Sequence, residues 1–278
     1  LIRAANEAFA DENIRFYTGV SYRHCMIVHN GSTNYKLTPP HDVLGKRVGD
    51  NLPQGEGSEF ITEMMKKSYE ILNNHPVNIA RREKGLNPAN TLWIWGQGKK
   101  PSLSSFSAKY HLDGSVISAV DLIKGIGLCA GLDSIYVPGV TATLHTNYEG
   151  KASAAIDEFK KGKQFVYMHL EGPDECGHQG DTDDKLESMK LIDERIFAPI
   201  YGYLKSCGDD FRILIVPDHR TPIALRTHTS EPVPFVLYDS TREEPADTSK
   251  QFNEKAGEAS GMYFGSGFEM ADFFFTDK

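Results

Sequence analysis

Short apolar runs alternate with amphipathic segments over the second part of the chain. The longest amphipathic segment, 183–205, has apolar residues at 186, 189, 192, 196, 200 and 204, which predicts a helix with one buried face. We expect Ile192, Ile196 and Ile200 to be buried against a sheet. Nearly continuous apolar strands separated by helices are typical of an α/β fold with a largely parallel sheet covered on both faces. The expected strands are 115–118, 134–137, 164–170, 212–216 and 234–237, and the other expected helices are 120–130 and 151–161.

The first part of the chain follows a less regular pattern. A strand-rich stretch over 16–28 is interrupted at Gly19, and residues 38–42 are typical of a turn. An amphipathic helix is predicted over 58–74. The apolar stripe of that helix is expected to consist of Phe60, Met64, Ile71 and Leu72.

A polar, proline-containing segment at 99–105 separates these two patterns. Such segments are common between domains, so we predict one domain over 1–105 and a second over 106–278. The chain does not begin with Met, and residues 1–6 have the pattern of a helix interior. We therefore expect the sequence to be a piece of a longer protein.

Composition narrows the possible partners. The 278 residues are 40% hydrophobic and 24% charged, as in globular proteins, and no apolar run is long enough to predict a transmembrane helix. A net charge of −8 disfavours general binding to nucleic acid or to an anionic membrane surface. An anionic substrate would then need local Lys, Arg or metal charge. The four cysteines form no CxxC pair, which argues against a disulfide framework or a zinc ribbon, and we expect a cytoplasmic protein.

Three polar clusters follow predicted strands, where sites form in open α/β sheets. They are 171–178, the Pro217-Asp218-His219 stretch, and the Thr227-His228-Thr229 stretch. Asp and His are ligands for Zn, Mn and similar cations. Each cluster alone is more typical of surface residues, a helix cap or a hydrogen-bonded pair. Three clusters at successive strand ends favour a shared metal centre.

Other motifs carry less chemistry. The glycines at 125, 127 and 131 depart by one residue from a dinucleotide-binding fingerprint, and helix capping and close packing explain them better. Trp93 and Trp95 could stack on a ligand, but half-buried packing in a strand is the commoner role. The pairs at 81–82 and 99–100 are basic and are expected to be solvated.

The polar clusters also resemble a known family. The segments 169–178, 217–222 and 226–235 are similar to motifs of the cofactor-independent phosphoglycerate mutases of archaeal type, in the alkaline phosphatase superfamily. The similarity extends to 19–24, 39–42, 93–98 and 117–125 and covers essentially the whole chain. It implies an alkaline-phosphatase-like core with a partial inserted α+β domain over 1–105 that covers the substrate. It also implies interconversion of 3- and 2-phosphoglycerate through a phospho-enzyme.

The resemblance assigns roles to individual residues. It implies that Asp174, His178 and His228 hold one divalent cation and that Asp218 and His219 hold a second, the cations being Mn, Zn or Mg. Further positions match a phosphate-contacting lysine, Lys124, and plausible substrate contacts, Arg23 and His24.

The chain departs from the family pattern in two places. The family begins with a strand that carries a metal-binding Asp, followed by a Ser or Thr nucleophile, and we find neither here. The second metal site would then lack ligands, so we expect this chain to be inactive or nearly so. Arg220 also stands where the family pattern has Pro, which concerns the geometry of that loop.

Two alternatives stay open at this stage. One is another phosphotransferase or phosphohydrolase of the same superfamily, including a proposed homoserine kinase. The other is a non-catalytic binding module that retains the fold. Phosphate release without isomer formation would indicate a hydrolase, and failure to bind Mn or Zn would indicate the module. If the chain comes from an enzyme, mutase or other, its partner is expected to be a small phosphorylated substrate. The sequence leaves the oligomeric state open.

Overall fold

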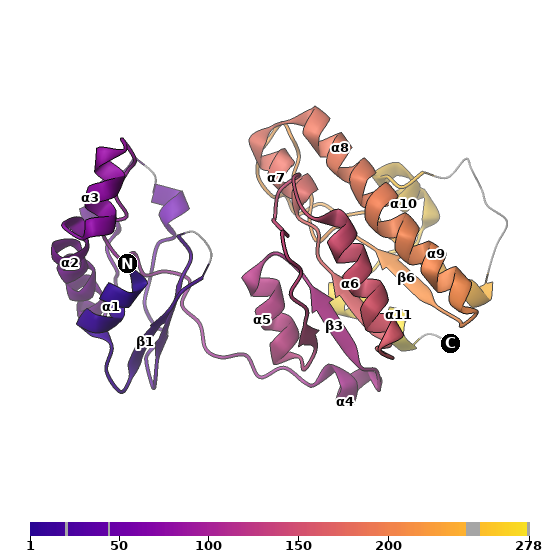
Figure 1. Ribbon diagram of the computed structural model, residues 1–278, viewed down its shortest axis with the longest axis horizontal. Coiled ribbons are helices and arrows are strands. Elements are labelled where there is room, and N and C mark those ends of the chain that lie inside the picture. Colours follow the sequence, from indigo (N-terminus) through magenta and orange to yellow (C-terminus); the bar gives the residue numbers. More distant parts are fainter. Residues whose placement is uncertain (20–21, 44, 243–250, 277–278) are drawn as a thin grey trace. The chain divides into compact units, whose positions relative to one another are not determined.

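The computed structural model describes residues 1–19, 22–43, 45–242 and 251–276 (Figure 1). The chain divides into two units, 1–101 and 102–278, and each is described by itself. No helix of the described residues is both long enough and apolar enough to cross a bilayer.

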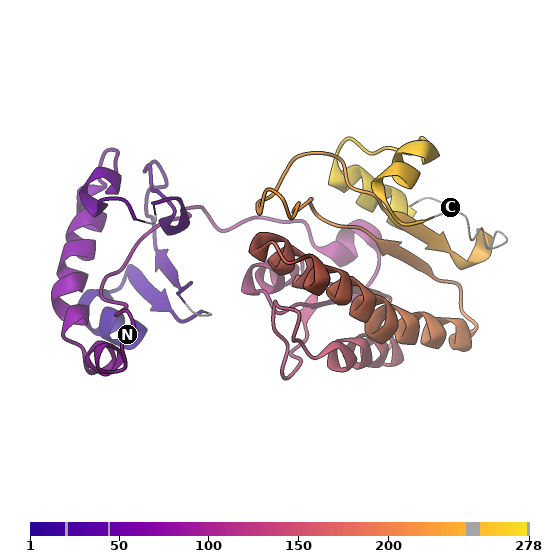
Figure 2. The same cartoon turned by 90° about the horizontal axis from the view of Figure 1, so that it is seen from above.

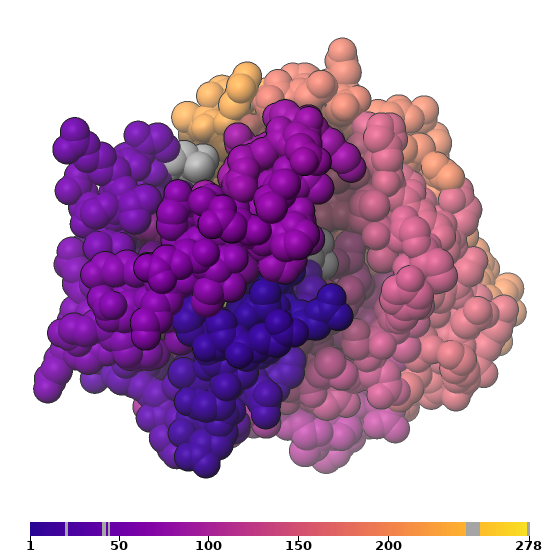
Figure 3. Space-filling view, turned by 60° about the vertical axis from the view of Figure 1, so that its left-hand side comes forward, coloured from indigo at the N-terminus to yellow at the C-terminus, as the bar shows by residue number. Residues whose placement is uncertain are grey.

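The first unit combines a small antiparallel sheet with helices. Strands β1 (Ile14–Tyr17) and β2 (Cys25–Val28) pair with Ile14 opposite Val28, which agrees with the strand-rich stretch predicted around Gly19. Figure 3 shows one face of this unit, from the indigo N-terminal helix to the purple segment that follows. Its elements are α1 (Ile2–Phe9), β1 (Ile14–Tyr17), β2 (Cys25–Val28), η1 (Pro40–Val43), η2 (Val48–Asn51), α2 (Glu59–Asn73) and α3 (Pro76–Glu83).

Helix α2 buries only part of the predicted stripe: Met64 and Leu72 are buried as expected, and the other two residues are not. Phe60 and Ile71 are 39% and 38% exposed, whereas Ser68 is fully buried. The Ser68 hydroxyl donates to the Met65 carbonyl and accepts from the Leu92 amide, so this polar side chain is satisfied inside the unit. A stripe drawn through apolar residues alone therefore identifies only part of the buried face. The buried residues of the helix are Ile61, Met64, Met65, Ser68 and Leu72.

The segment with the two tryptophans forms no strand. Trp93 and Trp95 are half-buried in irregular backbone, and the Trp93 indole N–H donates to the Thr38 carbonyl at 2.7 Å. The packing role is therefore retained while the predicted strand is wrong. Trp93 joins two loops of the first unit.

A three-stranded parallel sheet forms the centre of the second unit, in the order β4 (Asp133–Ser134), β3 (Gly114–Ile117), β5 (Phe165–Met168). All of β3 is buried, as expected for a central parallel strand. The strand predicted over 134–137 is shorter than expected, because only Asp133 and Ser134 pair with β3 as a strand. Val137 still joins the apolar core around Ile117.

A second sheet consists of β6 (Arg212–Ile215) and β7 (Val236–Asp239), which pair antiparallel. The prediction of a mostly parallel α/β sheet is confirmed for the three central strands, and β6–β7 is the exception. Strand patterns do not distinguish the two cases, because both are short apolar runs. Figure 2 shows the two sheets with helices packed around them. These helices are α4 (Phe106–Tyr110), α5 (Asp121–Cys129), α6 (Tyr148–Lys160), α7 (Gly172–Gln179), α8 (Thr182–Ile192), α9 (Ala198–Cys207), η4 (Ser240–Arg242), α10 (Glu254–Ser260) and α11 (Gly267–Thr276).

The long helix predicted over 183–205 is present but contains a π-helical turn, η3 (Asp193–Phe197), between α8 and α9. Pro199 lies two residues after this turn. It has no backbone N–H, so regular hydrogen bonding cannot continue through the turn. Ile196 is 4% exposed, whereas Leu186 is 61% exposed. The predicted stripe therefore holds near the middle of the helix and fails at its start.

The α5 glycines have structural roles, as predicted. Gly127 packs so closely on β3 that a Cβ there would lie 2.5 Å from Val116 Cγ1. Gly131, just beyond the helix, has a φ of +79°, a left-handed conformation that favours glycine. These three glycines lie within or just after a helix and so do not form a strand-to-helix phosphate loop.

Candidate metal centre

The candidate centre begins at the carboxyl end of β5, where the chain turns into α7. Asp174 and His178 lie four residues apart on this helix, which places both side chains on one face. The helix is bounded by Pro173 in its first turn and by Gly180, whose φ of +75° ends it. The motif thus folds into one helix that presents a carboxylate and an imidazole together.

The third residue, His228, comes from the loop after β6. An isolated bridge closes this loop, in which the Thr229 amide donates to the Arg220 carbonyl at 3.1 Å. The bridge places His219 and His228 side by side, with ring centroids 3.7 Å apart. Arg220, the residue that departs from the family pattern, is therefore part of the turn that positions the histidines.

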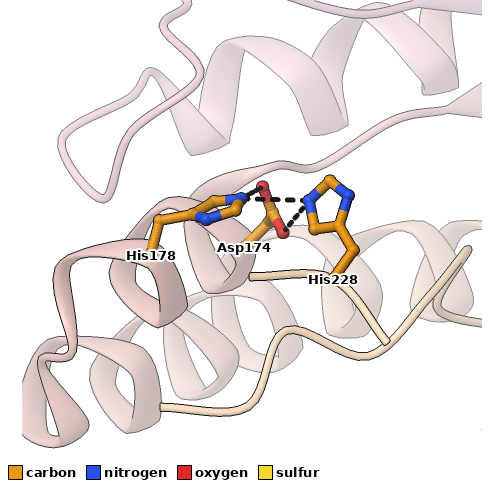
Figure 4. A group of neighbouring side chains, drawn as sticks. All are labelled: Asp174, His178 and His228. Carbon is orange, nitrogen blue, oxygen red and sulfur yellow. Dashed lines mark hydrogen bonds and ion pairs between the residues drawn. The ribbon is translucent and has the colours of Figure 1, made fainter. Parts of the chain in front are cut away.

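Three side chains converge on one point (Figure 4). His178 Nε2 lies 3.0 Å from His228 Nε2 and 3.3 Å from Asp174 Oδ2, and His228 Nε2 lies 3.3 Å from Asp174 Oδ1. Tetrahedral zinc with ligand bonds of about 2.0–2.1 Å places its ligands roughly 3.3 Å apart. The arrangement therefore has the spacing and the ligand types of a divalent-cation site. It is the only such three-residue group found among the described residues.

Hydrogen bonding orients the His178 ring toward that point. Its Nδ1 lies 3.0 Å from the Arg226 carbonyl, which can only accept. We therefore assign the proton to Nδ1, leaving the Nε2 lone pair free toward the other ligands. Arg226 has a φ of +55°, an uncommon left-handed conformation for a residue other than glycine.

The centre is partly open to solvent. The Asp174 side chain is 22% exposed and that of His228 is 51% exposed. A cation could therefore enter from solvent while the carboxylate stays largely enclosed.

Asp218 and His219 lie beside this group without forming a second three-residue cluster in the described part of the chain. His219 Nδ1 is 3.9 Å from Asp174 Oδ1, and its Nε2 is 3.5 Å from Asp218 Oδ2. The Asp218 carboxylate is 67% exposed. The structure thus places these two residues next to the first group.

The remaining predicted site residues have local contacts. The Lys124 ammonium pairs with Asp121 Oδ1 at 3.2 Å in the first turn of α5. Arg23 and His24 belong to the first unit, just before β2. His24 Nδ1 accepts from the Gly19 amide at 3.2 Å, and partial burial lowers the pKa of this imidazole.

The structure adds polar residues near the centre that the sequence did not single out. His169, at the end of β5, lies 3.4 Å from the Ser118 hydroxyl, and burial lowers its pKa. Lys151 of α6 is 2% exposed; burial lowers its pKa, and the charge of Glu171 acts in the opposite direction. Thr221 donates its hydroxyl to Asp174 Oδ1. His169 and Glu171 belong to the first motif, so the sequence could have drawn attention to them. Thr221 and Lys151 have no sequence pattern that distinguishes them from surface residues.

Comparison with protein families identifies the class. The model of the metalloenzyme superfamily matches residues 41–262. The chain therefore belongs to the metalloenzyme superfamily, whose alkaline-phosphatase-like fold agrees with the parallel sheet and flanking helices. The model of 2,3-bisphosphoglycerate-independent phosphoglycerate mutase matches residues 1–78.

Individual relatives narrow the assignment. A 2,3-bisphosphoglycerate-independent phosphoglycerate mutase of Methanosarcina barkeri is 44% identical over 263 residues, 94% of this chain and 66% of the relative. A probable enzyme of the same name from Geobacter sulfurreducens is 43% identical over 272 residues, 98% of this chain and 67% of the relative. Within the superfamily, this chain is a member of the 2,3-bisphosphoglycerate-independent phosphoglycerate mutase family. It spans about two thirds of the length of these relatives.

A solved structure supports the fold. The cofactor-independent phosphoglycerate mutase from Thermoplasma acidophilum superposes with a TM-score of 0.54 and 23% identity, covering 93% of this chain and 64% of that one. At this identity the likeness is evidence for the fold alone.

Proposed function

We propose that this chain carries the first metal site and most of the substrate-handling residues of an enzyme that interconverts 3- and 2-phosphoglycerate. The observation that carries the proposal is the convergence of Asp174, His178 and His228 from two motifs on different elements. Family membership adds support, because relatives over nearly the whole chain bear the mutase name. Those names do not favour the phosphohydrolase, kinase or binding-module alternatives.

Each of the five proposed metal ligands has a defined role in this proposal. Asp174, His178 and His228 would hold one divalent cation, and Asp218 with His219 would contribute to a second. When bound, two such cations, drawn from Mn, Zn or Mg, acidify a nucleophilic hydroxyl and neutralise phosphoryl oxygens.

The other proposed tasks concern the substrate. The Lys124 ammonium would exchange its contact with Asp121 for a phosphate oxygen, and it would supply local positive charge in a chain of net charge −8. Arg23 and His24, in the unit proposed to cover the substrate, would contact the phosphorylated acid. The four free cysteines fit the proposed cytoplasmic location.

The chemical step needs groups that the family resemblance places upstream of Leu1. There a Ser or Thr hydroxyl would attack phosphorus while the bond between phosphorus and the glycerate oxygen breaks. The other glycerate hydroxyl would then take the phosphoryl group from the enzyme. The same upstream segment would supply an Asp to the second cation.

The test compares the 278-residue chain with a longer polypeptide that restores this upstream segment. We expect the short chain to bind about one cation and to show no measurable conversion of 3- to 2-phosphoglycerate. We expect the longer polypeptide to gain a second cation and mutase activity together, because one segment supplies both.

Two variants test whether the activity depends on the proposed metal site. Asp174→Asn should abolish the activity of the longer polypeptide, whereas Asp157→Asn, at a 60% exposed position of α6, should leave it unchanged. Robust mutase activity from the short chain, or phosphate release without isomer formation by the longer one, would contradict the proposal.

A further inference from the structure

Thr221 is a buried residue between the three-residue candidate group and the neighbouring pair of Asp218 and His219. It is 5% exposed and lies in the loop two residues after His219. Its hydroxyl donates to Asp174 Oδ1 and lies 3.3 Å from His219 Nδ1. One hydroxyl therefore contacts a residue of the converging group and a residue of the neighbouring pair.

The backbone of Thr221 is held in place from the other side. Lys185 of α8 donates from its ammonium to the Thr221 carbonyl at 2.8 Å. Gly177 of α7 packs so closely that a Cβ there would lie 2.6 Å from that carbonyl oxygen and 2.9 Å from Thr221 Cγ2. Because α7 also carries Asp174, the threonine and the carboxylate are fixed relative to each other.

The number of available hydrogens determines which group donates in each contact of the Thr221 hydroxyl. A hydroxyl has one hydrogen to donate, and a carboxylate can only accept, so that hydrogen goes to Asp174. The contact with His219 can then form only if the ring nitrogen Nδ1 carries a proton and donates to the hydroxyl oxygen. That tautomer leaves the lone pair on His219 Nε2. Asp174 Oδ1, at 3.9 Å from Nδ1, is too distant to be the alternative acceptor.

We propose that Thr221 is a positioning residue that fixes the Asp174 carboxylate and holds His219 in the tautomer whose Nε2 can bind a cation. This inference rests on the proposed function, because it requires Asp174 to be a metal ligand. Hydrogen-bond partners of metal ligands commonly change metal affinity by about 10–100-fold when removed. Thr221 thus links the two proposed cation sites through one hydroxyl.

The test measures Zn²⁺ and Mn²⁺ affinity of the 278-residue chain by competition with a chromophoric chelator. Thr221→Val keeps the shape and removes the hydroxyl, and we expect affinity to fall about 10–100-fold. Thr221→Ser restores the hydroxyl and should recover most of the affinity. The matched control is Thr241→Val, because Thr241 also donates its hydroxyl to an aspartate, Asp239, away from the centre. That control should bind metal like the unmodified chain.

A second readout needs no metal. In the metal-free chain, long-range ¹H–¹⁵N NMR should show the Nδ1–H tautomer of His219 in the unmodified chain and in Thr221→Ser. Thr221→Val should shift the ring toward the Nε2–H tautomer, and a His219→Gln variant assigns the signals. Loss of packing alone would not distinguish the serine from the valine variant in this way.

The outcomes separate the two proposals. If the unmodified chain binds no Zn²⁺ or Mn²⁺, or if Asp174→Asn binds as well as the unmodified chain, the metal site is wrong and this inference fails with it. If binding depends on Asp174 but Thr221→Val changes neither the affinity nor the His219 tautomer, the metal site stands and the role of Thr221 is overturned.

Discussion

At the scale of single residues, Asp239 shows how a carboxylate is stabilised in its charged form. Its carboxylate, 8% exposed, accepts from the Thr241 hydroxyl at 2.6 Å, the Thr241 amide at 2.9 Å and Arg212 Nε at 2.8 Å. Hydrogen bonds from Thr241 and the charge of Arg212 lower the pKa of Asp239 from 3.8 to about 2. The bond from Arg212 joins the end of β7 to the start of β6.

This shift predicts a pH dependence of stability. A carboxyl group whose pKa is lower in the folded state stabilises the fold above its unfolded pKa and loses that effect as pH falls through the folded value. The difference in unfolding free energy between the chain and Asp239→Asn should therefore be largest above about pH 4. It should shrink as pH falls toward 2, as measured by urea unfolding over a pH series. Thr241→Val should weaken this dependence, and a difference that stays constant with pH would show that the carboxylate is not held as described.

At the scale of elements, the long helix buries the predicted apolar stripe at its π turn and exposes it near its start. Ile196 lies in that turn and is 4% exposed, whereas Leu186, earlier on the same predicted stripe, is 61% exposed. We expect Ile196→Ala to lower the unfolding free energy by about 2–5 kcal/mol, because it leaves a cavity in the packed interior. Leu186→Ala is the matched control and should change it by less than about 0.5 kcal/mol. Equal effects of the two variants in urea unfolding would contradict this placement of the helix.

The element scale also shows what the sequence could and could not predict. Helices α2, α5 and α6 and the long helix follow from apolar periodicity, and strands β3, β5 and β6 follow from short apolar runs. The remaining helices of the described residues gave no comparable signal. The full buried face of α2 could not be predicted, since Ser68 is buried through hydrogen bonds that only the folded neighbours provide. The pairing direction of β6 and β7 was equally inaccessible, because it depends on contacts between distant segments.

At the scale of the whole molecule, the candidate centre combines predictable and unpredictable parts. Asp174, His178 and His228 could be selected because polar clusters at strand ends are brought together by the topology of an α/β sheet. Thr221 could not, because a loop threonine is usually solvent-facing and its contact with Asp174 is known only from the folded structure. Family membership agrees with a metal centre, and the assignment of individual ligands is our proposal.

The central claim is that Asp174, His178 and His228 bind a divalent cation, and X-ray absorption on the Zn²⁺-loaded 278-residue chain tests it most directly. The account predicts about one Zn²⁺ per chain with only nitrogen and oxygen ligands at about 2.0–2.2 Å, with multiple scattering from two imidazoles. It also predicts loss of this spectrum in Asp174→Asn. Cys176, on the same helix, is 3% exposed and should take no part. A sulfur ligand at about 2.3 Å, or an unchanged spectrum in Asp174→Asn, would contradict the account.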